Sequence, residues 1–177
     1  MIFLETERLL FRSHQVEDER DFVQMHTDPE VRRYVGGNAW PVEKAVYRFH
    51  AEYLGRPSRT YGLWAAILKS EGKYAGCCGL HSRSTGEGGA YAKLGYYLAR
   101  PYWRRGLATE ASAAFVDAAF SRLRLAFVVA SVQKGNDASE HILQKLGFVF
   151  AKREEIPGRV YHIYELTRDQ YKTSGPR

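Results

Sequence analysis

A strand–helix–strand unit in the second half of the sequence limits the folds that this chain can adopt. Tyr91–Ala99 is rich in tyrosine and aliphatic residues, which predicts a strand. Leu107–Arg122 has apolar residues at every fourth position and contains no glycine or proline, which predicts a helix. Ala126–Val132 is a short apolar run of β-forming residues that predicts a buried strand. Since strands joined through such a helix lie parallel in one sheet, this unit predicts an α/β fold with one parallel crossover.

The remaining sequence predicts antiparallel strands and short helices. Helical spacing covers Val16–Thr27 and Val42–Leu54, with a helical turn over Glu30–Val35 between them. Asp137 and Glu140 form a capping-box pattern at the start of another short helix. We expect a mixed, mostly antiparallel central sheet with one parallel crossover, two N-terminal helices and two helices in the C-terminal half. The other predicted strands are Leu9–Arg12, Tyr61–Leu68, Tyr74–His81, Phe148–Arg153 and Val160–Leu166, with a loop over Ser82–Gly89.

Length and composition indicate one globular domain over residues 1–177. A chain of 177 residues can bury a core that needs no disulfide or metal ion. No apolar run approaches the roughly 18 residues that span a membrane, and the N-terminus lacks the pattern of a signal peptide. Cys77 and Cys78 are adjacent in an apolar strand, where they point to opposite faces and are poorly placed to bridge each other. We therefore expect a cytoplasmic protein with no membrane partner and no metal ion.

The net charge favours anionic ligands without identifying one. The formal net charge is +6 at pH 7, which is compatible with nucleic acid, acidic membranes and phosphorylated cofactors. The arginines are dispersed, with no long block of like charges and no known nucleic-acid recognition motif. A basic nucleic-acid-binding domain is therefore only an alternative, and we expect no nucleic-acid partner.

The segment between the strand Tyr91–Ala99 and the long helix has the features of an anion-binding turn. Pro101 has no backbone donor and suits the end of a strand. The first turn of a helix leaves N–H groups unpaired and carries partial positive charge, which suits a pyrophosphate. Gly106 allows a close approach of the backbone, whereas Arg104 and Arg105 each cost about 0.3–1 kcal/mol there unless an anion is bound. The alternative is a surface loop with two solvated arginines. Neither a Rossmann dinucleotide pattern nor a P-loop is present.

The segment Pro101–Ala111, PYWRRGLATEA, resembles the acetyl-CoA-binding motif of the GNAT superfamily of N-acetyltransferases. That motif is written Gln/Arg-x-x-Gly-x-Gly/Ala, and residues 105–108 match its second half. Trp103 stands where Gln or Arg is usual, a departure that is typical of the RimJ/RimL-like branch of ribosomal-protein N-terminal acetyltransferases and their relatives. Glu5–Arg12 is similar to the first strand of that branch, and Asn136–Ser139 followed by Leu143–Phe148 is similar to its second cofactor segment.

The resemblance implies a site for acetyl-CoA as cofactor. The pyrophosphate is expected on the amides of the turn, and the pantetheine arm in a slot opened by a splay between the two parallel strands. Ser139 is expected near the thioester sulfur as hydrogen-bond donor or general acid, which makes it the implied catalytic residue. Each of three residues has a structural alternative. Ser139 could hydrogen-bond the backbone in the first turn of a helix, and Asn136 could be an ordinary turn residue. Lys145 could serve only to stabilise the C-terminal end of a helix. The implied cofactor-binding residues are Tyr97, Leu98, Ala99, Trp103, Arg104, Arg105, Gly106, Leu107, Ala108, Thr109, Asn136, Ser139 and Lys145.

An acceptor pocket is expected beside that slot. The resemblance implies an acetyl-CoA-dependent transfer to a primary amine, either a small molecule or a peptide N-terminus, by direct attack on the thioester. A non-catalytic CoA-binding or regulatory module with the same fold is the alternative, and a homodimer is compatible with the sequence. No general base is singled out, since water relays serve as well as a side chain. Tyr34, Trp40, Trp64 and Tyr96 are the expected wall residues, with core or loop packing as the alternative for each. Candidates for the base are His26, His81, Glu87, Tyr96 and His162.

Overall fold

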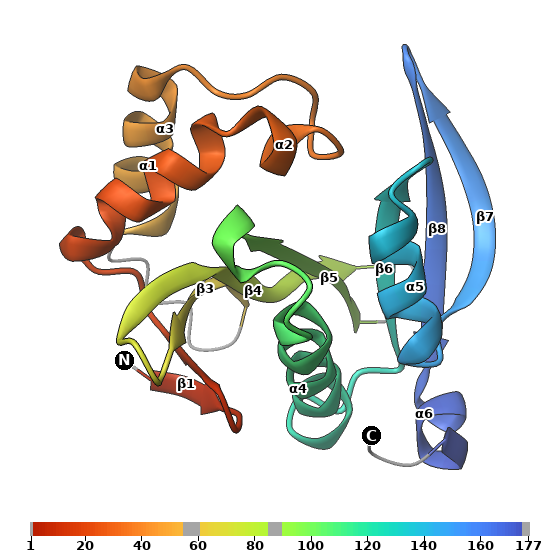
Figure 1. Ribbon diagram of the computed structural model, residues 1–177. Coiled ribbons are helices and arrows are strands. Elements are labelled where there is room, and N and C mark those ends of the chain that lie inside the picture. Colours follow the sequence, from red (N-terminus) through yellow and green to blue (C-terminus); the bar gives the residue numbers. More distant parts are fainter. Residues whose placement is uncertain (1, 55–60, 85–89, 175–177) are drawn as a thin grey trace.

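An eight-stranded sheet forms the centre of the computed structural model, which describes residues 2–54, 61–84 and 90–174 (Figure 1). The strands lie in the order β1-β2-β3-β4-β5-β6-β8-β7. The strands are β1 Ile2–Glu5, β2 Leu9–Arg12, β3 Gly62–Leu68, β4 Lys73–Ser84, β5 Ala90–Leu98, β6 Phe127–Gln133, β7 Val149–Ile156 and β8 Arg159–Thr167. The α-helices are α1 Glu19–Thr27, α2 Pro29–Arg32, α3 Val42–Arg48, α4 Leu107–Ser121, α5 Asp137–Lys145 and α6 Arg168–Ser174.

One pair of neighbouring strands is parallel and all the others are antiparallel. The parallel pair is β5 and β6, which are joined through α4, and the remaining pairs run antiparallel. The mixed, mostly antiparallel sheet with one parallel crossover is therefore confirmed. The parallel pairing is short, since only Tyr91–Lys93 faces Phe127–Val129. Beyond these residues the two strands are not paired with each other, although β5 continues to Leu98 and β6 to Gln133.

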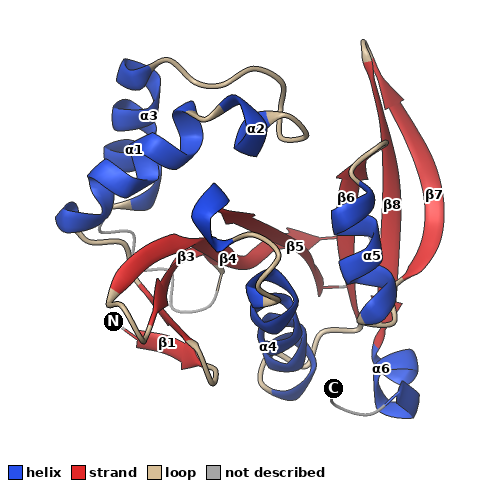
Figure 2. Cartoon of the chain, in the orientation of Figure 1, coloured by secondary structure: helices blue, strands red, loops and turns tan. Residues whose placement is uncertain are grey.

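Helices cover both faces of the sheet (Figure 2). On one face, α1 and the segment after α3 contribute Phe22 and Phe49 to a core cluster that includes Cys77. On the other, α4 and α5 pack on a larger cluster that includes Cys78 and Leu143. Side chains of each strand alternate between these faces, which we call the α1–α3 face and the α4–α5 face. As predicted, the adjacent cysteines point to opposite faces, and both are free and buried.

Several elements differ from the sequence prediction. The edge strand β1 and the C-terminal α6 were not predicted; each is short, and α6 is held by the ring of Tyr171 stacked on Phe120 at 4.9 Å. Strand β4 continues to Ser84, into the predicted loop, because its last residues pair with β5. The predicted helix that starts at Val42 ends its α-helical part at Arg48 and continues as a π-helical turn over Phe49–Tyr53.

The predicted capping box at Asp137 and Glu140 is wrong. The N-cap of α5 is Asn136, whose side chain accepts a hydrogen bond from the backbone N–H of Ser139. Glu140 instead contacts His162 on β8, with 2.7 Å between Oε1 and Nδ1. The carboxylate of Glu140, which the local pattern assigned to the start of the helix, is therefore used in a tertiary contact with His162.

Glu110, in the first turn of α4, fixes the β1–β2 connection to the helix. Its carboxylate accepts hydrogen bonds from the hydroxyl of Thr6 at 2.5 Å, the backbone N–H of Arg8 at 2.9 Å and the guanidinium of Arg8 at 2.6 Å. Burial alone raises the pKa of Glu110, but these hydrogen bonds outweigh it and hold the pKa below its usual value. The start of α4 is therefore anchored by an ionised carboxylate.

We expect Glu110→Gln to destabilise the protein by about 1 kcal/mol at pH 7. Because the folded pKa is lowered, the stabilisation is complete above the usual carboxyl pKa of about 4.3 and is lost as pH falls through the folded value. Urea unfolding from pH 7 downward measures this difference. Glu43→Gln, at an exposed first-turn position of α3, is the matched control. A Glu110→Gln deficit that stays constant as the pH falls contradicts the assignment.

Candidate functional site

The separation of β5 and β6 opens a cavity of about 320 Å³, which we call the β5–β6 cavity. Residues from both faces of the sheet line it. Tyr96 and Leu143 belong to or pack against the cluster on the α4–α5 face, whereas Tyr97 packs against the cluster on the α1–α3 face. The cavity therefore passes through the sheet and joins its two sides. Its lining includes Tyr34, His81, Tyr96, Tyr97, Asn136, Ser139 and Tyr161.

The turn between β5 and α4 presents backbone amides that have no partner within the helix. Gly106 is the N-cap and adopts a left-handed conformation with φ of 75°, and no side chain caps the helix. The first intrahelical hydrogen bond is donated by the amide of Glu110 to the carbonyl of Gly106, at 3.0 Å. The amides of residues 107–109 therefore lack an intrahelical acceptor. Arg104 is also left-handed, with φ of 58°, a strained backbone conformation of the kind that gathers at ligand sites.

Contacts within the protein hold this turn in place. The indole N–H of Trp103 donates to the carbonyl of Leu98 at 2.7 Å, so that carbonyl already accepts one hydrogen bond. Arg8 donates to the backbone carbonyl of Arg105 at 2.7 Å, and the guanidinium of Arg105 lies 3.8 Å from Glu71. Trp103 thus has a structural role where the superfamily motif has Gln or Arg.

Two hydroxyl groups meet at the start of α5. Asn136 and Ser139 both line the β5–β6 cavity, and the side chain of Ser139 is hydrogen-bonded to that of Tyr96. Burial raises the pKa of Tyr96 to about 12, and the hydrogen bond from Ser139 only partly opposes it. The phenol therefore keeps its proton at neutral pH and is available as a donor. Lys145, in the last turn of α5, is exposed and is not among the cavity-lining residues.

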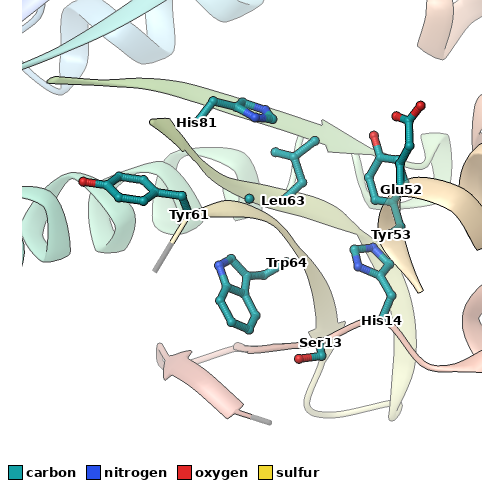
Figure 3. Close-up of a pocket in the computed structure, with 9 residues that line it drawn as sticks. Ser13, His14, Glu52, Tyr53, Tyr61, Leu63, Trp64 and His81 are labelled. Atoms are coloured by element: carbon teal, nitrogen blue, oxygen red, sulfur yellow. The ribbon is translucent and has the colours of Figure 1, made fainter. Parts of the chain in front are cut away.

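Residues at the start of β3 line a second cavity, of about 510 Å³ (Figure 3). We call it the β3 cavity. His14, Tyr53 and Trp64 are among its lining residues, and His81 lines both cavities. Burial lowers the pKa of His14 to about 4, so this imidazole is neutral at pH 7. His81 is therefore the residue at which the two cavities meet.

The expected acceptor-wall residues separate into three groups. Tyr34 and Tyr96 line the β5–β6 cavity, and Trp64 lines the β3 cavity. Trp40 lines neither; its ring stacks on His26 with 4.6 Å between ring centroids. The sequence also missed Tyr161, which reaches the β5–β6 cavity from β8. Only the pairing of β8 beside β6 brings this tyrosine to the opening.

The candidate bases differ in how they meet the cavities. Burial lowers the pKa of His26 to about 3, and both of its ring nitrogens are buried without a hydrogen-bond partner. His162 is bound to Glu140 and is not among the lining residues of either cavity. His81 and Tyr96 line the β5–β6 cavity. Glu87 lies outside the described residues.

The described part of the chain holds no group of three His, Cys, Asp or Glu side chains arranged for a metal ion. Nor does it contain a helix long and apolar enough to cross a membrane.

Sequence comparison assigns most of the chain to one family. Residues 8–149 match the family model described as "Acetyltransferase (GNAT) domain". The "Uncharacterized N-acetyltransferase YoaA" of Bacillus subtilis is 30% identical over 149 residues, covering 82% of this chain and 81% of that protein. The "Uncharacterized protein YkkB" of Bacillus subtilis is 28% identical over 165 residues, covering 92% of this chain and 94% of that protein.

Solved structures share the fold. A GNAT-family acetyltransferase from Bacillus anthracis superposes with a TM-score of 0.82 at 22% identity, covering 96% of this chain and 99% of that one. RimL, a ribosomal L7/L12 α-N-protein acetyltransferase solved with coenzyme A, superposes with a TM-score of 0.77 at 13% identity. The match covers 97% of this chain and 100% of that one. The RimL identity shows the shared fold and leaves the RimJ/RimL-like branch a prediction. From the family model and the relatives, this chain belongs to the GNAT family of acetyltransferases.

Proposed function

We propose that this chain binds acetyl-CoA at the turn before α4 and transfers the acetyl group to a primary amine. The observation that carries the proposal is the β5–β6 cavity, which joins the two faces of the sheet at the end of their parallel pairing. An acyl donor on the α4–α5 face and an amine on the α1–α3 face can meet there without crossing the core. Holding two reactants in line supplies much of the rate of such a transfer.

The residues of the turn fit a pyrophosphate. The amides of residues 107–109 lack intrahelical acceptors, and the N-cap Gly106 brings no side chain between them and a ligand. The guanidinium of Arg104 adds positive charge at the same position. RimL, with the same fold, was solved with coenzyme A, which supports coenzyme A as the ligand. Bound acetyl-CoA supplies the acetyl group as a thioester.

Ser139 and Tyr96 are placed to assist departure of the thiolate. The amine nitrogen attacks the carbonyl carbon, the carbon–sulfur bond breaks and the sulfur takes a proton. The hydrogen-bonded hydroxyls of Ser139 and Tyr96 line the cavity between the faces, and the raised pKa of Tyr96 keeps its proton in place until then. Ser139 was the implied catalytic residue; Tyr96, expected as a wall residue, joins it as a donor.

His81 is placed to take the proton from the attacking amine. It lies on the α1–α3 face, since a side chain at Gly95 would meet both His81 and Leu63, and Leu63 packs against the cluster on that face. It lines both cavities, so an amine entering from either one passes its imidazole. Imidazole is the side chain that most often serves as a general base.

We expect Gly106→Val to abolish CoA binding, because a β-branched side chain blocks approach to the amides. The measurement is the rise in Tm on adding CoA, which for a ligand at 100 times Kd corresponds to about 2.7 kcal/mol. Gly72→Val is the matched control, since Gly72 also has a positive φ, of 64°, and lies in an exposed turn with nothing within 4 Å of an added Cβ. Both variants lose stability through backbone strain, but only Gly106→Val loses the shift. A Gly106→Val protein that keeps the CoA shift contradicts this site.

We expect Ser139→Ala and Tyr96→Phe each to lower kcat by about tenfold or more while leaving the Kd for CoA within about threefold. Each removes a proton donor that acts on the leaving sulfur and little that binds the cofactor. Free-thiol release measures kcat, and calorimetry measures Kd. Unchanged turnover in both variants removes these hydroxyls from the mechanism. CoA binding with no acetylated product from any amine supports the non-catalytic alternative.

We expect His81→Gln to lower kcat/KM by about a hundredfold at pH 7, as for loss of a general base. The deficit shrinks at high pH, where the free amine is already deprotonated. His141→Gln, an exposed histidine of α5, is the control and leaves the pH profile unchanged. A His81→Gln profile parallel to that of the wild type shows that water, and not His81, accepts the proton.

A further inference from the structure

Arg32, the last residue of α2, is buried and has no acidic partner. Only 5% of the surface of Arg32 is exposed, and its Nε is buried without a hydrogen-bond partner. Its guanidinium carbon lies 4.3 Å from the centre of the Trp40 ring, a cation–π contact. Among the described residues, no carboxylate oxygen lies within 4.0 Å of its guanidinium nitrogens, the distance that defines an ion pair. A buried cation without a counter-ion is costly, so this one needs an explanation.

The groups that face Arg32 add positive charge. Burial lowers the pKa of Arg32, the phenols of Tyr97 and Tyr53 oppose this effect, and Arg48 and Arg159 lower the pKa further. Burial also raises the pKa of Tyr97 to about 12, so that phenol is uncharged at neutral pH. Guanidinium nevertheless stays protonated in proteins. Arg32 is therefore a retained charge among neutral phenols and like charges.

The acidic residues of the same region are engaged elsewhere. Glu52 pairs with Arg48 at 2.8 Å, Asp28 lies 3.7 Å from Arg100, and Glu30 lies 3.9 Å from the neighbouring Arg33. None of them is among the groups that shift the pKa of Arg32. The described residues of this chain therefore supply no counter-ion to Arg32.

The guanidinium of Arg32 lies beside the β5–β6 cavity. Its Nη2 would be 3.1 Å from a Cβ added at Gly36, and Gly36 lines the cavity together with Tyr97, one of the phenols that act on Arg32. Arg159, at the start of β8, reaches across to Gly37, where its Nη2 lies 2.1 Å from the place of an added Cβ. The glycine pair thus leaves room for both guanidinium groups next to the cavity wall, where Gly36 is the lining residue and Arg32 lies directly behind it.

We infer that the acceptor is an amino-acid-sized primary amine that also carries an anionic group, and that Arg32 binds that group. The inference rests on the proposed acetyl transfer and narrows its acceptor. A planar guanidinium matches a carboxylate in two parallel hydrogen bonds, and it is suited to phosphate as well. The cavity of about 320 Å³ is of the size that holds small molecules. In the transfer the amine nitrogen forms the new carbon–nitrogen bond, the carbon–sulfur bond breaks, and the anionic group is unchanged.

The first test is the Tm of Arg32→Met without and with amines. Since removing an uncompensated buried charge relieves its cost, the ligand-free variant melts at or above the wild type, whereas loss of a structural arginine lowers Tm by several degrees. Amino acids at 10 mM raise the Tm of the wild type, and their carboxamides do not. Arg32→Met loses that shift. Arg20→Met, an exposed arginine of α1 with the same change of charge, keeps it.

The second test is acetyl transfer with matched acceptors. The ratio of kcat/KM for an amino acid to that for its carboxamide falls at least tenfold in Arg32→Met and is unchanged in Arg20→Met. Taking this ratio in each protein removes the different basicity of the two amines. Arg32→Lys keeps the positive charge but lacks the planar guanidinium, and it gives an intermediate ratio. If Arg32→Met does not fold, Arg32→Lys is the variant that tests the inference. Phosphoethanolamine is the test acceptor that carries a phosphate in place of a carboxylate. A higher kcat/KM for phosphoethanolamine than for amino acids assigns the anionic group as phosphate.

The outcomes separate this inference from the proposed function. An Arg32-dependent Tm shift by amino acids or phosphoethanolamine without acetylation supports the anion site and counts against the transferase. Acetylation of carboxamides or cationic amines with a ratio that Arg32→Met and Arg32→Lys leave unchanged overturns the inference and leaves the transferase intact. A large fall in Tm of ligand-free Arg32→Met together with an unchanged anion shift also overturns it, since Arg32 is then structural.

Discussion

The early end of the pairing between β5 and β6 is the constraint on which the rest of this structure depends. The two strands share three residue pairs and then separate, although both continue for several residues. Unpaired strand edges inside a protein need partners for their backbone groups, or a ligand. The crossover helix α4 starts after β5 and α5 starts after β6, with Asn136 and Ser139 at the opening. The main interruption of the sheet and the donor groups of α5 therefore coincide.

The two faces of the sheet prepare this opening for different groups. Strand alternation sends Tyr96 toward Ser139 on the α4–α5 face, and Tyr97 toward Arg32 on the α1–α3 face. The first pair offers neutral hydroxyl donors, and the second lies beside a buried positive charge. Two consecutive tyrosines thus separate a region suited to acyl transfer from one suited to an anionic acceptor.

Some buried polar groups of the described chain have partners, and others, such as Ser112 Oγ in α4 and Arg32 Nε, have none. Asp18 is buried but makes two hydrogen bonds with Arg12, at 2.6 and 2.8 Å. Glu110 is likewise satisfied by Thr6 and Arg8. Around the opening, by contrast, Arg104 is left-handed and Arg32 has a buried, unpaired Nε. Such local costs are expected where a ligand completes the structure.

The sequence by itself determined the parallel crossover and the place of the turn before α4. Periodicity in Leu107–Arg122 and the two flanking β-rich segments was enough to predict the parallel crossover, because these signals are local and depend on backbone geometry. Gly106 could be assigned to the turn for the same reason. The tertiary structure alone decided which side chains meet at the opening. Local patterns gave no reason to place Tyr161 at the cavity, to pair Glu140 with His162, or to bury Arg32. These outcomes follow from strand order and from packing between segments distant in sequence, which no local pattern records.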